Sequence, residues 1–344
     1  MTVTARIVAS RISTNVDYDK PGLQCGFLRV PHSSHESAYG WIPVPICVAA
    51  NGSGPTVLLM AGNHGDEYEG QIALMKILRS FEPSEIRGRV ILLTAANLPA
   101  VMAGRRVSPI DGGNLNRSFP GDPNGTPTEM IAHYIENVLL PMCQYSFDLH
   151  SGGSSLEYVA SVHARYGVDE RIRADTLAAI TAFGAPYGGL FKPLEGEPRT
   201  MGAAAERKNV LHLNIEIGGG GTVSRELVTK AENGVRRLLA HIGIIPGAPR
   251  DDMPKKIRYF AIEGASNYVY CMDQGLFEPL AALHQEVQAG QPAGALHFPD
   301  TPWARETVVK FECSGVVLCR RFPGWARRGD CLYQIGSPSQ YVAL

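Results

Sequence analysis

Two histidines and a glutamate occupy positions from which they could bind one metal ion. His64 and Glu67 lie three residues apart in the segment MAGNHGDEYEG, which overlaps the end of the apolar run TVLLM at residues 56 to 60. His150 ends a second apolar stretch in the motif FDLHSGG. Two histidines and one carboxylate, with a fourth position open for water, suit a catalytic zinc. A lone histidine is more often structural, but both motifs read as strand ends, where open α/β sheets place their sites.

A hydrolytic zinc site also needs a group that moves protons, and Glu216 is the candidate. Zinc lowers the pKa of bound water from about 15.7 to about 7, which makes hydroxide available at neutral pH. Glu216 stands on the polar side of the alternating segment VLHLNIEI, beside the glycines at 218 to 221. A carboxylate on a buried strand is costly without a purpose, and glycines let a substrate approach closely. The structural alternative is an ion-paired carboxylate of the core.

Asp148 is a candidate partner for His150. It lies two residues earlier in the chain, so on a strand both side chains point to the same side of the sheet. From there its carboxylate could accept a hydrogen bond from an imidazole and fix the tautomer of the metal ligand. Capping a nearby loop is an equally weighted alternative.

The segment from 97 to 126 supplies the candidate substrate contacts. It is rich in glycine, proline, asparagine and arginine, and long loops in compact domains are usually functional. Arg117, beside Asn116, offers a planar fork that can hold a carboxylate through two hydrogen bonds. Arg106 could donate to the oxyanion that forms when water attacks a carbonyl. A plain loop salt bridge is the alternative for each arginine.

The elements that must position these residues alternate between strand and helix, which predicts an α/β domain. Residues 1 to 50 read as a β or irregular lead-in. The spacing of apolar residues predicts strands over 56–60, 90–93, 145–150 and 210–217, and helices over 68–81, 128–140 (capped by Thr128), 169–182 and 224–241.

After about residue 250 the sequence shows no strong helical pattern. We therefore expect a catalytic domain over 1–250 and a β-sandwich or barrel-like domain over 251–344. A weak repeat has Gly275 and Gly290 fifteen residues apart, and Gly315 and Gly329 fourteen apart. Each half reads as a glycine, a strand, a turn, a bend and another strand, and resembles half of a biotinyl/lipoyl-type domain. No lysine stands at the hairpin tip, so we expect no attached cofactor. A generic small β domain is the alternative.

Composition excludes several other classes of protein. The 344 residues carry a net charge of −1 and no basic tract, so nucleic acid and charged membranes are not expected partners. No apolar run reaches the roughly 20 residues that cross a bilayer. The N-terminus lacks a signal-peptide pattern. Seven scattered cysteines argue against a disulfide framework and for a reduced, cytoplasmic setting. A homo-oligomer is compatible with the sequence.

Four motifs in order, NHGDEYEG, PIDGGNLNRSFPG, DLHSGG and NIEIGGGG, resemble the succinylglutamate desuccinylase/aspartoacylase family, relatives of the zinc carboxypeptidases. The resemblance covers roughly residues 50 to 245. It implies a carboxypeptidase-like mixed sheet flanked by helices, with a smaller C-terminal all-β domain. It also implies one zinc ion per chain, bound by His64, Glu67 and His150. Glu216 would act as base and then as acid. Asn116 and Arg117 would bind the substrate carboxylate, and Arg106 would lie near the scissile carbonyl. Between Arg106 and the Asn-Leu-Asn-Arg run, the chain is longer than in animal aspartoacylases.

Within the family, the extended motif NHGDEYEGQIAL and the C-terminal β region are most similar to the N-acetyl-L-2,4-diaminobutyrate deacetylases of ectoine breakdown. The resemblance therefore implies a zinc hydrolase that removes an acetyl group from an N-acyl amino acid. The alternatives are a deacylase of succinylglutamate or acetylaspartate, a carboxypeptidase, and a non-catalytic zinc- or ligand-binding module. Glu216 disfavours the last, because a binding module needs no base.

An acetyl-diaminobutyrate substrate would need a carboxylate facing its side-chain ammonium. The sequence offers several and does not choose among them: Asp66, Glu69, Asp111, Glu129, Glu157 and Glu195.

Overall fold

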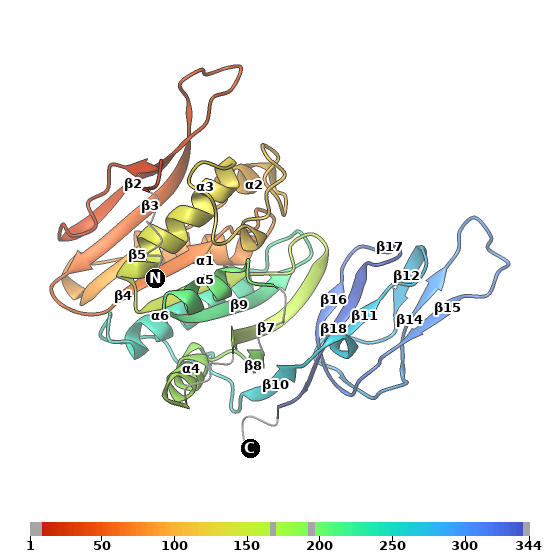
Figure 1. Cartoon of the computed structure of the whole chain (residues 1–344). Helices are drawn as coiled ribbons and strands as arrows, with labels where there is room; N and C mark the ends of the chain where they lie inside the picture. The colour runs from red at the N-terminus through yellow and green to blue at the C-terminus, as the bar shows by residue number, and fades with distance from the viewer. Residues whose placement is uncertain (1–8, 166–169, 192–196, 340–344) are drawn as a thin grey trace, which may run out of the picture.

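The computed structural model describes residues 9–165, 170–191 and 197–339. Most strands form one long mixed sheet (Figure 1). It runs in the order β1 (Ser13–Thr14), β2 (Gly22–Pro31), β3 (Trp41–Asn51), β5 (Gly88–Leu93), β4 (Thr56–Ala61), β6 (Tyr145–His150), β9 (Leu211–Gly219), β7 (Leu156–Arg165), β8 (Tyr187–Phe191), β10 (Arg258–Ile262), β18 (Cys331–Pro338), β16 (Gly315–Arg321) and β13 (Glu286–Val287), with β11 (Tyr268–Tyr270) beside β18.

Helices cover both faces of the central strands. The α-helices are α1 (Tyr68–Arg79), α2 (Leu98–Ala103), α3 (Pro127–Tyr134), α4 (Glu170–Phe183), α5 (Met201–Arg207) and α6 (Arg225–His241). Helices α1, α4 and α6 belong to the apolar core on one face of the sheet, which includes Val57 and Leu59, whereas α3 and α5 belong to the core on the other face, which includes Leu58 and Met60. A strand buried on both sides explains why TVLLM is continuously apolar rather than alternating.

The predicted alternation of strands and helices is confirmed. Some elements end at other residues than predicted, and β7, β8, α2 and α5 were not predicted. Helix α3 begins after Thr126 rather than Thr128. The Thr126 side chain accepts from the backbone N–H of Glu129, and the Glu129 carboxylate accepts from that of Thr126. The predicted helix was expected to reach residue 140, but α3 ends at Tyr134. A π-helical turn (Ile135–Leu139) and a 3-10 turn (Leu140–Met142) follow it. Pro141 lacks the N–H that an α-helix would use there.

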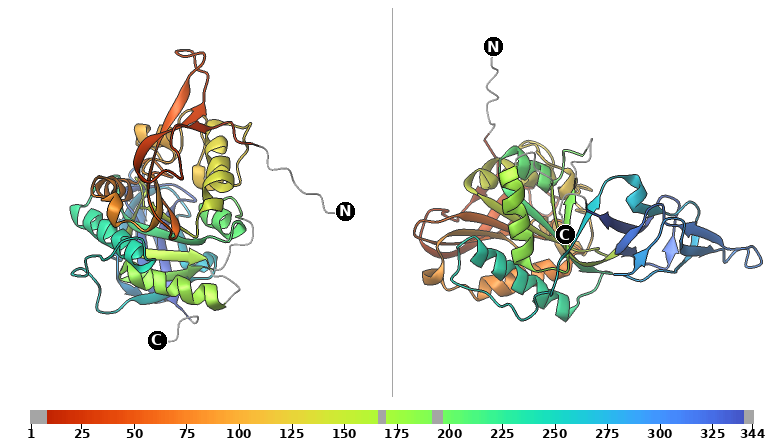
Figure 2. Two further views of the ribbon diagram at one scale, coloured as in Figure 1. Left: turned by 90° about the vertical axis from the view of Figure 1, so that its left-hand side faces the viewer. Right: turned by 90° about the horizontal axis from the view of Figure 1, so that it is seen from below.

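Residues 251–339 contain strands and a 3-10 turn (Ala265–Asn267), and no α-helix. The glycine repeat is confirmed, because Gly275 and Gly315 open β12 (Gly275–Pro279) and β16, while Gly290 and Gly329 lie in turns before β14 (Pro292–His297) and β18. A small sheet of β15 (Thr307–Lys310), β14, β12 and β17 (Trp325–Ala326) projects from the helix-flanked part (Figure 2). The long sheet nevertheless runs across residue 250, since β10 pairs with β8 and β16 with β7.

One disulfide joins Cys25 in β2 to Cys47 in β3, at facing positions whose Cα atoms are 4.2 Å apart. This corrects the expectation that the cysteines are reduced, although a single bond is not a framework. Scattered spacing could not reveal the pair, because β-strand register brings the two residues together. None of the described helices is both long and apolar enough to cross a membrane.

Replacing Thr126 by alanine is expected to lower the free energy of unfolding by about 1 kcal/mol, because the start of α3 loses its capping side chain. Chemical denaturation followed by circular dichroism measures the change. Thr126→Ser keeps the hydroxyl and is the control. Equal stability of the alanine and serine variants would show that this cap is not needed.

Candidate metal centre and adjoining pocket

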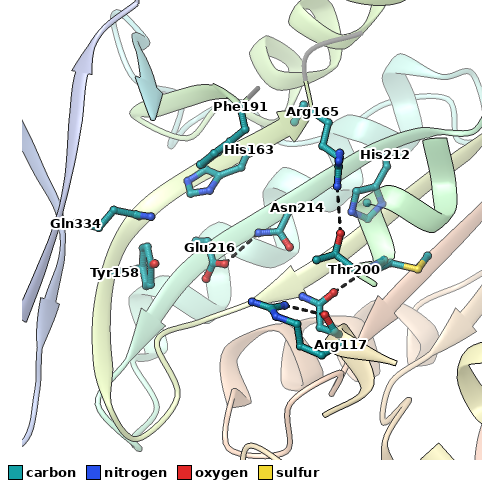
Figure 3. A pocket seen from close by; sticks show the side chains of 14 residues that line it. Arg117, Tyr158, His163, Arg165, Phe191, Thr200, His212, Asn214, Glu216 and Gln334 are labelled. Atoms are coloured by element: carbon teal, nitrogen blue, oxygen red, sulfur yellow. Dashed lines mark hydrogen bonds between the residues drawn. The ribbon is translucent and has the colours of Figure 1, made fainter. Parts of the chain in front are cut away.

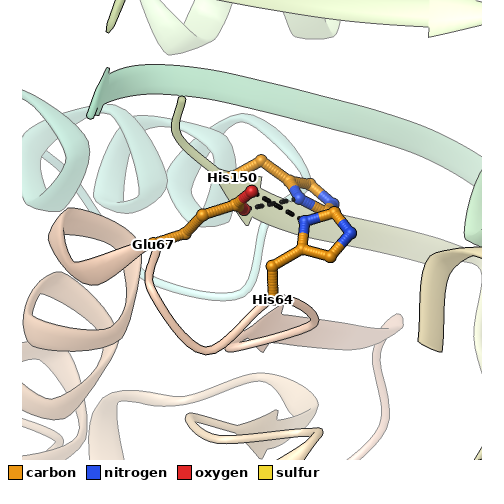
Figure 4. Close-up of side chains that lie close together, drawn as sticks. All are labelled: His64, Glu67 and His150. Carbon is orange, nitrogen blue, oxygen red and sulfur yellow. Dashed lines mark hydrogen bonds and ion pairs between the residues drawn. The ribbon is translucent and has the colours of Figure 1, made fainter. Parts of the chain in front are cut away.

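The three predicted ligands meet in one buried cluster. One ligand atom each of His64, Glu67 and His150 lies within 4.8 Å of the others. His64 Nδ1 is 2.7 Å from Glu67 Oε1, and His150 Nδ1 is 2.8 Å from Glu67 Oε2 (Figure 4). Two imidazole nitrogens and a carboxylate oxygen are the donors that a catalytic zinc takes. The cluster therefore fits the metal that the sequence led us to expect.

Strand pairing and one glycine bring the cluster together. Strands β4 and β6 are parallel neighbours, so their carboxyl ends, with His64 just after one and His150 on the other, meet at one sheet edge. The turn between His64 and Glu67 packs tightly against α2. A Cβ on Gly65 would lie 2.0 Å from the carbonyl carbon of Ala100, so only glycine fits there.

The far ring nitrogens of both histidines are held by oxygen atoms. His64 Nε2 is 3.2 Å from Asn114 Oδ1, and His150 Nε2 is 2.8 Å from Asp148 Oδ2. Asp148 Oδ2 also accepts a hydrogen bond from Asn63 Nδ2 at 3.0 Å. Such contacts fix the ring orientation and leave Nδ1 as the nitrogen that can bind a metal. The structure thus places Asp148 where it can orient His150.

Electrostatics favour a cation at the centre of the cluster. Burial alone would raise the pKa of the Glu67 carboxyl, but the two histidines outweigh it and lower that pKa. Burial would likewise lower the pKa of His150, but Asp148 and Glu67 raise it above its usual value. These two carboxylates therefore stabilise positive charge among side chains that are themselves buried.

Glu216 lies next to the cluster on the neighbouring strand, because the β6–β9 register pairs His150 with Glu216. Asn214 Nδ2 donates to Glu216 Oε1 at 3.0 Å, whereas Oε2 is buried and has no partner among the described residues. Burial raises the pKa of the Glu216 carboxyl to about 8. A carboxyl with a raised pKa and one oxygen unengaged can accept a proton and release it.

The predicted loop residues reach the same region. Arg106 Nη1 lies 3.3 Å from His64 Nδ1 and 3.5 Å from Glu67 Oε1, so it stands beside the cluster. Asn116 Oδ1 accepts from the backbone N–H of Met201 at 2.9 Å. Arg117 Nη1 donates to the backbone oxygen of Asn116 at 2.7 Å. Both Asn116 and Arg117 line a pocket that also contains Glu216.

This pocket has a volume of about 250 Å³ (Figure 3). Several wall residues were not singled out as site residues in the sequence, chiefly Tyr158, His163, Arg165, Phe191, Thr200 and Gln334. Tyr158, His163 and Arg165 belong to β7 and Phe191 to β8, two strands that apolar periodicity did not reveal. His212 and Asn214 could be found from the alternation of VLHLNIEI, because they share a strand side with Glu216.

Comparison with known proteins places this site in a family. Residues 53–242 match the succinylglutamate desuccinylase/aspartoacylase catalytic domain. The chain belongs to this family. It is 40% identical, over 94% of each chain, to the N-alpha-acetyl-L-2,4-diaminobutyric acid deacetylase of Halomonas elongata.

Solved structures of relatives extend over the C-terminal strands as well. A succinylglutamate desuccinylase/aspartoacylase from Rhodobacter sphaeroides has a TM-score of 0.91 at 39% identity, covering 96% of this chain and 100% of that chain. The product-bound ectoine utilization protein EutE (DoeB) from Ruegeria pomeroyi has the same TM-score at 36% identity and the same coverage. The resemblance drawn from the four motifs is therefore confirmed, as is a mixed α/β fold with flanking helices.

Replacing Asp148 by asparagine is expected to weaken zinc binding about ten- to a hundredfold, because His150 loses its charged partner. Competition with a chromogenic chelator measures the affinity. Asp300→Asn makes the same change on an exposed carboxylate far along the chain and is the control. Unchanged affinity in Asp148→Asn would mean that this carboxylate does not support a metal ligand.

Proposed function

We propose that this chain is a zinc hydrolase that removes the acetyl group from the α-amino nitrogen of N-acetyl-2,4-diaminobutyrate. The observation that carries the proposal is the cluster of His64, Glu67 and His150 beside Glu216, whose Oε2 is buried and has no partner among the described residues. The relative from Halomonas elongata, 40% identical, bears the name of this activity. The EutE structure adds a relative from ectoine utilization.

His64, Glu67 and His150 would hold the zinc. When bound, zinc supplies a Lewis acid that polarises a carbonyl and makes a water acidic near neutral pH. Glu216 takes a proton from the attacking water at Oε2 and later delivers it to the nitrogen of the leaving amine. Arg106 donates a hydrogen bond to the carbonyl oxygen as negative charge develops on it.

Arg117 and Asn116 hold the carboxylate of the substrate. The guanidinium of Arg117 offers two parallel N–H groups to a carboxylate, and its side chain is about two-fifths exposed at the pocket. Its partner in this structure is the Glu197 carboxylate, with Nε 3.5 Å from Oε2. A substrate carboxylate replaces that contact. The side chain of Asn116 is fixed by its bond to the Met201 N–H.

The division at about residue 250 forms part of the proposal. Residues 1–250 carry the candidate ligands and base in a sheet of the zinc-carboxypeptidase kind, and a smaller β domain begins at about residue 251. Strand β18 of the smaller domain adds Gln334 to the pocket wall. In this proposal the C-terminal domain shapes the site entrance or an oligomer interface, and none of its described residues belongs to the candidate metal cluster.

Acetate release from a panel of acetylated and succinylated amino acids, with and without a chelator, tests the substrate class. We expect release from N-acetyl-2,4-diaminobutyrate that stops when zinc is removed and returns when zinc is added. Preferred cleavage of succinylglutamate or acetylaspartate would assign another deacylase. Full activity in a verified metal-free preparation would refute the zinc mechanism.

Glu216→Gln is expected to reduce kcat at least about a hundredfold, because an amide cannot accept the proton. Zinc content and melting temperature should stay near those of the wild type, since glutamine keeps the size of the side chain. A purely structural Glu216 gives the opposite pattern, with lost stability or metal and near-normal turnover in the folded fraction. In that event His212 would be the next base to test.

Arg117→Lys is expected to reduce kcat/KM by tens-fold or more with zinc retained, because a point charge cannot replace the planar fork. The wild-type enzyme should also discriminate strongly against the carboxamide analogue of the substrate. Comparable hydrolysis of the acid and its carboxamide would argue against this role.

A further inference from the structure

Among the described residues, the pocket shows no dedicated acid for a substrate ammonium to meet. Of the described residues that line it, the one carboxylate is Glu216, which the reaction already uses. The described candidate acids bond elsewhere: Asp66 to Ser154, Glu69 to Ser224, Asp111 to Thr128, Glu129 to Thr126 and Glu157 to Arg320. Glu195 lies outside the described residues. Uncharged groups in the wall are therefore the place to look for ammonium acceptors.

His163 presents one such acceptor. Its Nε2 is 2.8 Å from Ser161 Oγ, and the Ser161 hydroxyl donates to the carbonyl oxygen of Val159 at 3.3 Å. A hydroxyl has a single proton. When the Ser161 proton lies on the Val159 carbonyl, Nε2 of His163 is the donor to Ser161 and Nδ1 keeps its lone pair. Burial lowers the pKa of His163 to about 3, so the ring is neutral at pH 7.

The orientation of the His163 ring is fixed by packing. Its centroid lies 4.8 Å from that of Phe191 and 5.3 Å from that of Phe260. A ring held between two aromatic side chains keeps its acceptor nitrogen in one place, which a binding site requires.

Gln334 brings a second uncharged acceptor from the C-terminal strand β18. Its side chain is buried, at 5% exposure, and Oε1 has no hydrogen-bond partner among the described residues. A buried carbonyl oxygen without a partner costs stability. Gln334 Nε2 bonds to the Tyr268 hydroxyl at 3.0 Å. Since that hydroxyl can donate as well as accept, the amide can turn to present either atom to a ligand.

We propose that Gln334 Oε1 and His163 Nδ1 bind the side-chain ammonium of the substrate between the rings of Tyr158 and Phe191. Figure 3 shows the amide and the imidazole pointing into the pocket. An ammonium has three N–H donors and no acceptor, so two acceptors and an aromatic wall match it. This inference rests on the proposed deacetylase function and adds how the substrate side chain is selected.

The same wall disfavours a second carboxylate on the substrate. When Gln334 presents Oε1, its oxygen and His163 Nδ1 both offer lone pairs, which repel a carboxylate because an ionised carboxylate can only accept hydrogen bonds. Arg165, the further arginine of the pocket, has its Nε 3.1 Å from the Glu206 carboxylate and its Nη1 3.3 Å from the Thr200 hydroxyl. The part of the wall formed by Gln334 and His163 thus suits a cationic or neutral side chain better than the second carboxylate of the dicarboxylates that other members of the family are named for.

The test compares two substrates that differ only in the group to be recognised. N-acetyl-2,4-diaminobutyrate carries the ammonium, and N-acetylnorvaline has a methyl group in its place on a chain of equal length. We would measure kcat/KM for both with the zinc-loaded full chain in the wild type, Gln334→Met and His163→Phe. Gln274→Met, on an exposed glutamine of the same domain, is the matched control.

We expect the wild type to prefer the ammonium substrate and the ratio of the two kcat/KM values to fall about ten- to a hundredfold in each pocket variant. The ratio should not change in Gln274→Met. Gln334→Glu, which adds a negative charge at the same position, should raise the ratio.

An unchanged ratio in Gln334→Met would overturn the ammonium site, and so would equal turnover of both substrates by the wild type. Absence of acetate release from both compounds by the wild type would instead refute the deacetylase function, and the ammonium site with it. The rise in the kcat/KM ratio expected for Gln334→Glu can be measured even when His163→Phe does not fold.

Discussion

The register of three parallel strands is the constraint on which the rest of the site depends. Strands β4, β6 and β9 lie side by side, and Ala61 pairs with Leu149 while His150 pairs with Glu216. A shift of one residue would turn His150 and Glu216 to opposite faces of the sheet. The candidate metal ligands and the candidate base therefore come together through backbone pairing, which the apolar cores on both faces hold in register.

Much of this centre could be predicted because its residues lie in or beside elements with strong local patterns. The apolar run TVLLM placed His64 and Glu67 after a strand, and the alternation of VLHLNIEI put Glu216 on the polar side of another. Asp148 followed from the two-residue repeat of a strand. In each case the decisive information lies within a few residues of the side chain concerned.

The far side of the pocket could not be predicted, because it depends on pairing between distant segments. Strand β7 lies between β9 and β8, and its run LEYVASVHAR mixes small and polar residues without a clear period. Gln334 reaches the wall because β18 joins the long sheet through β10 and β16. Neither local propensity nor periodicity contains that order, and the same holds for the pairing of Cys25 with Cys47.

The location of one metal ion would test the account most directly. A crystal grown with zinc, measured on both sides of the zinc absorption edge, should show one anomalous peak per chain. The account predicts the peak about 2.0–2.2 Å from Nδ1 of His64, Nδ1 of His150 and an oxygen of Glu67. Absence of a peak at this cluster in a zinc-replete, active preparation, or coordination by a residue beyond 250, would contradict it.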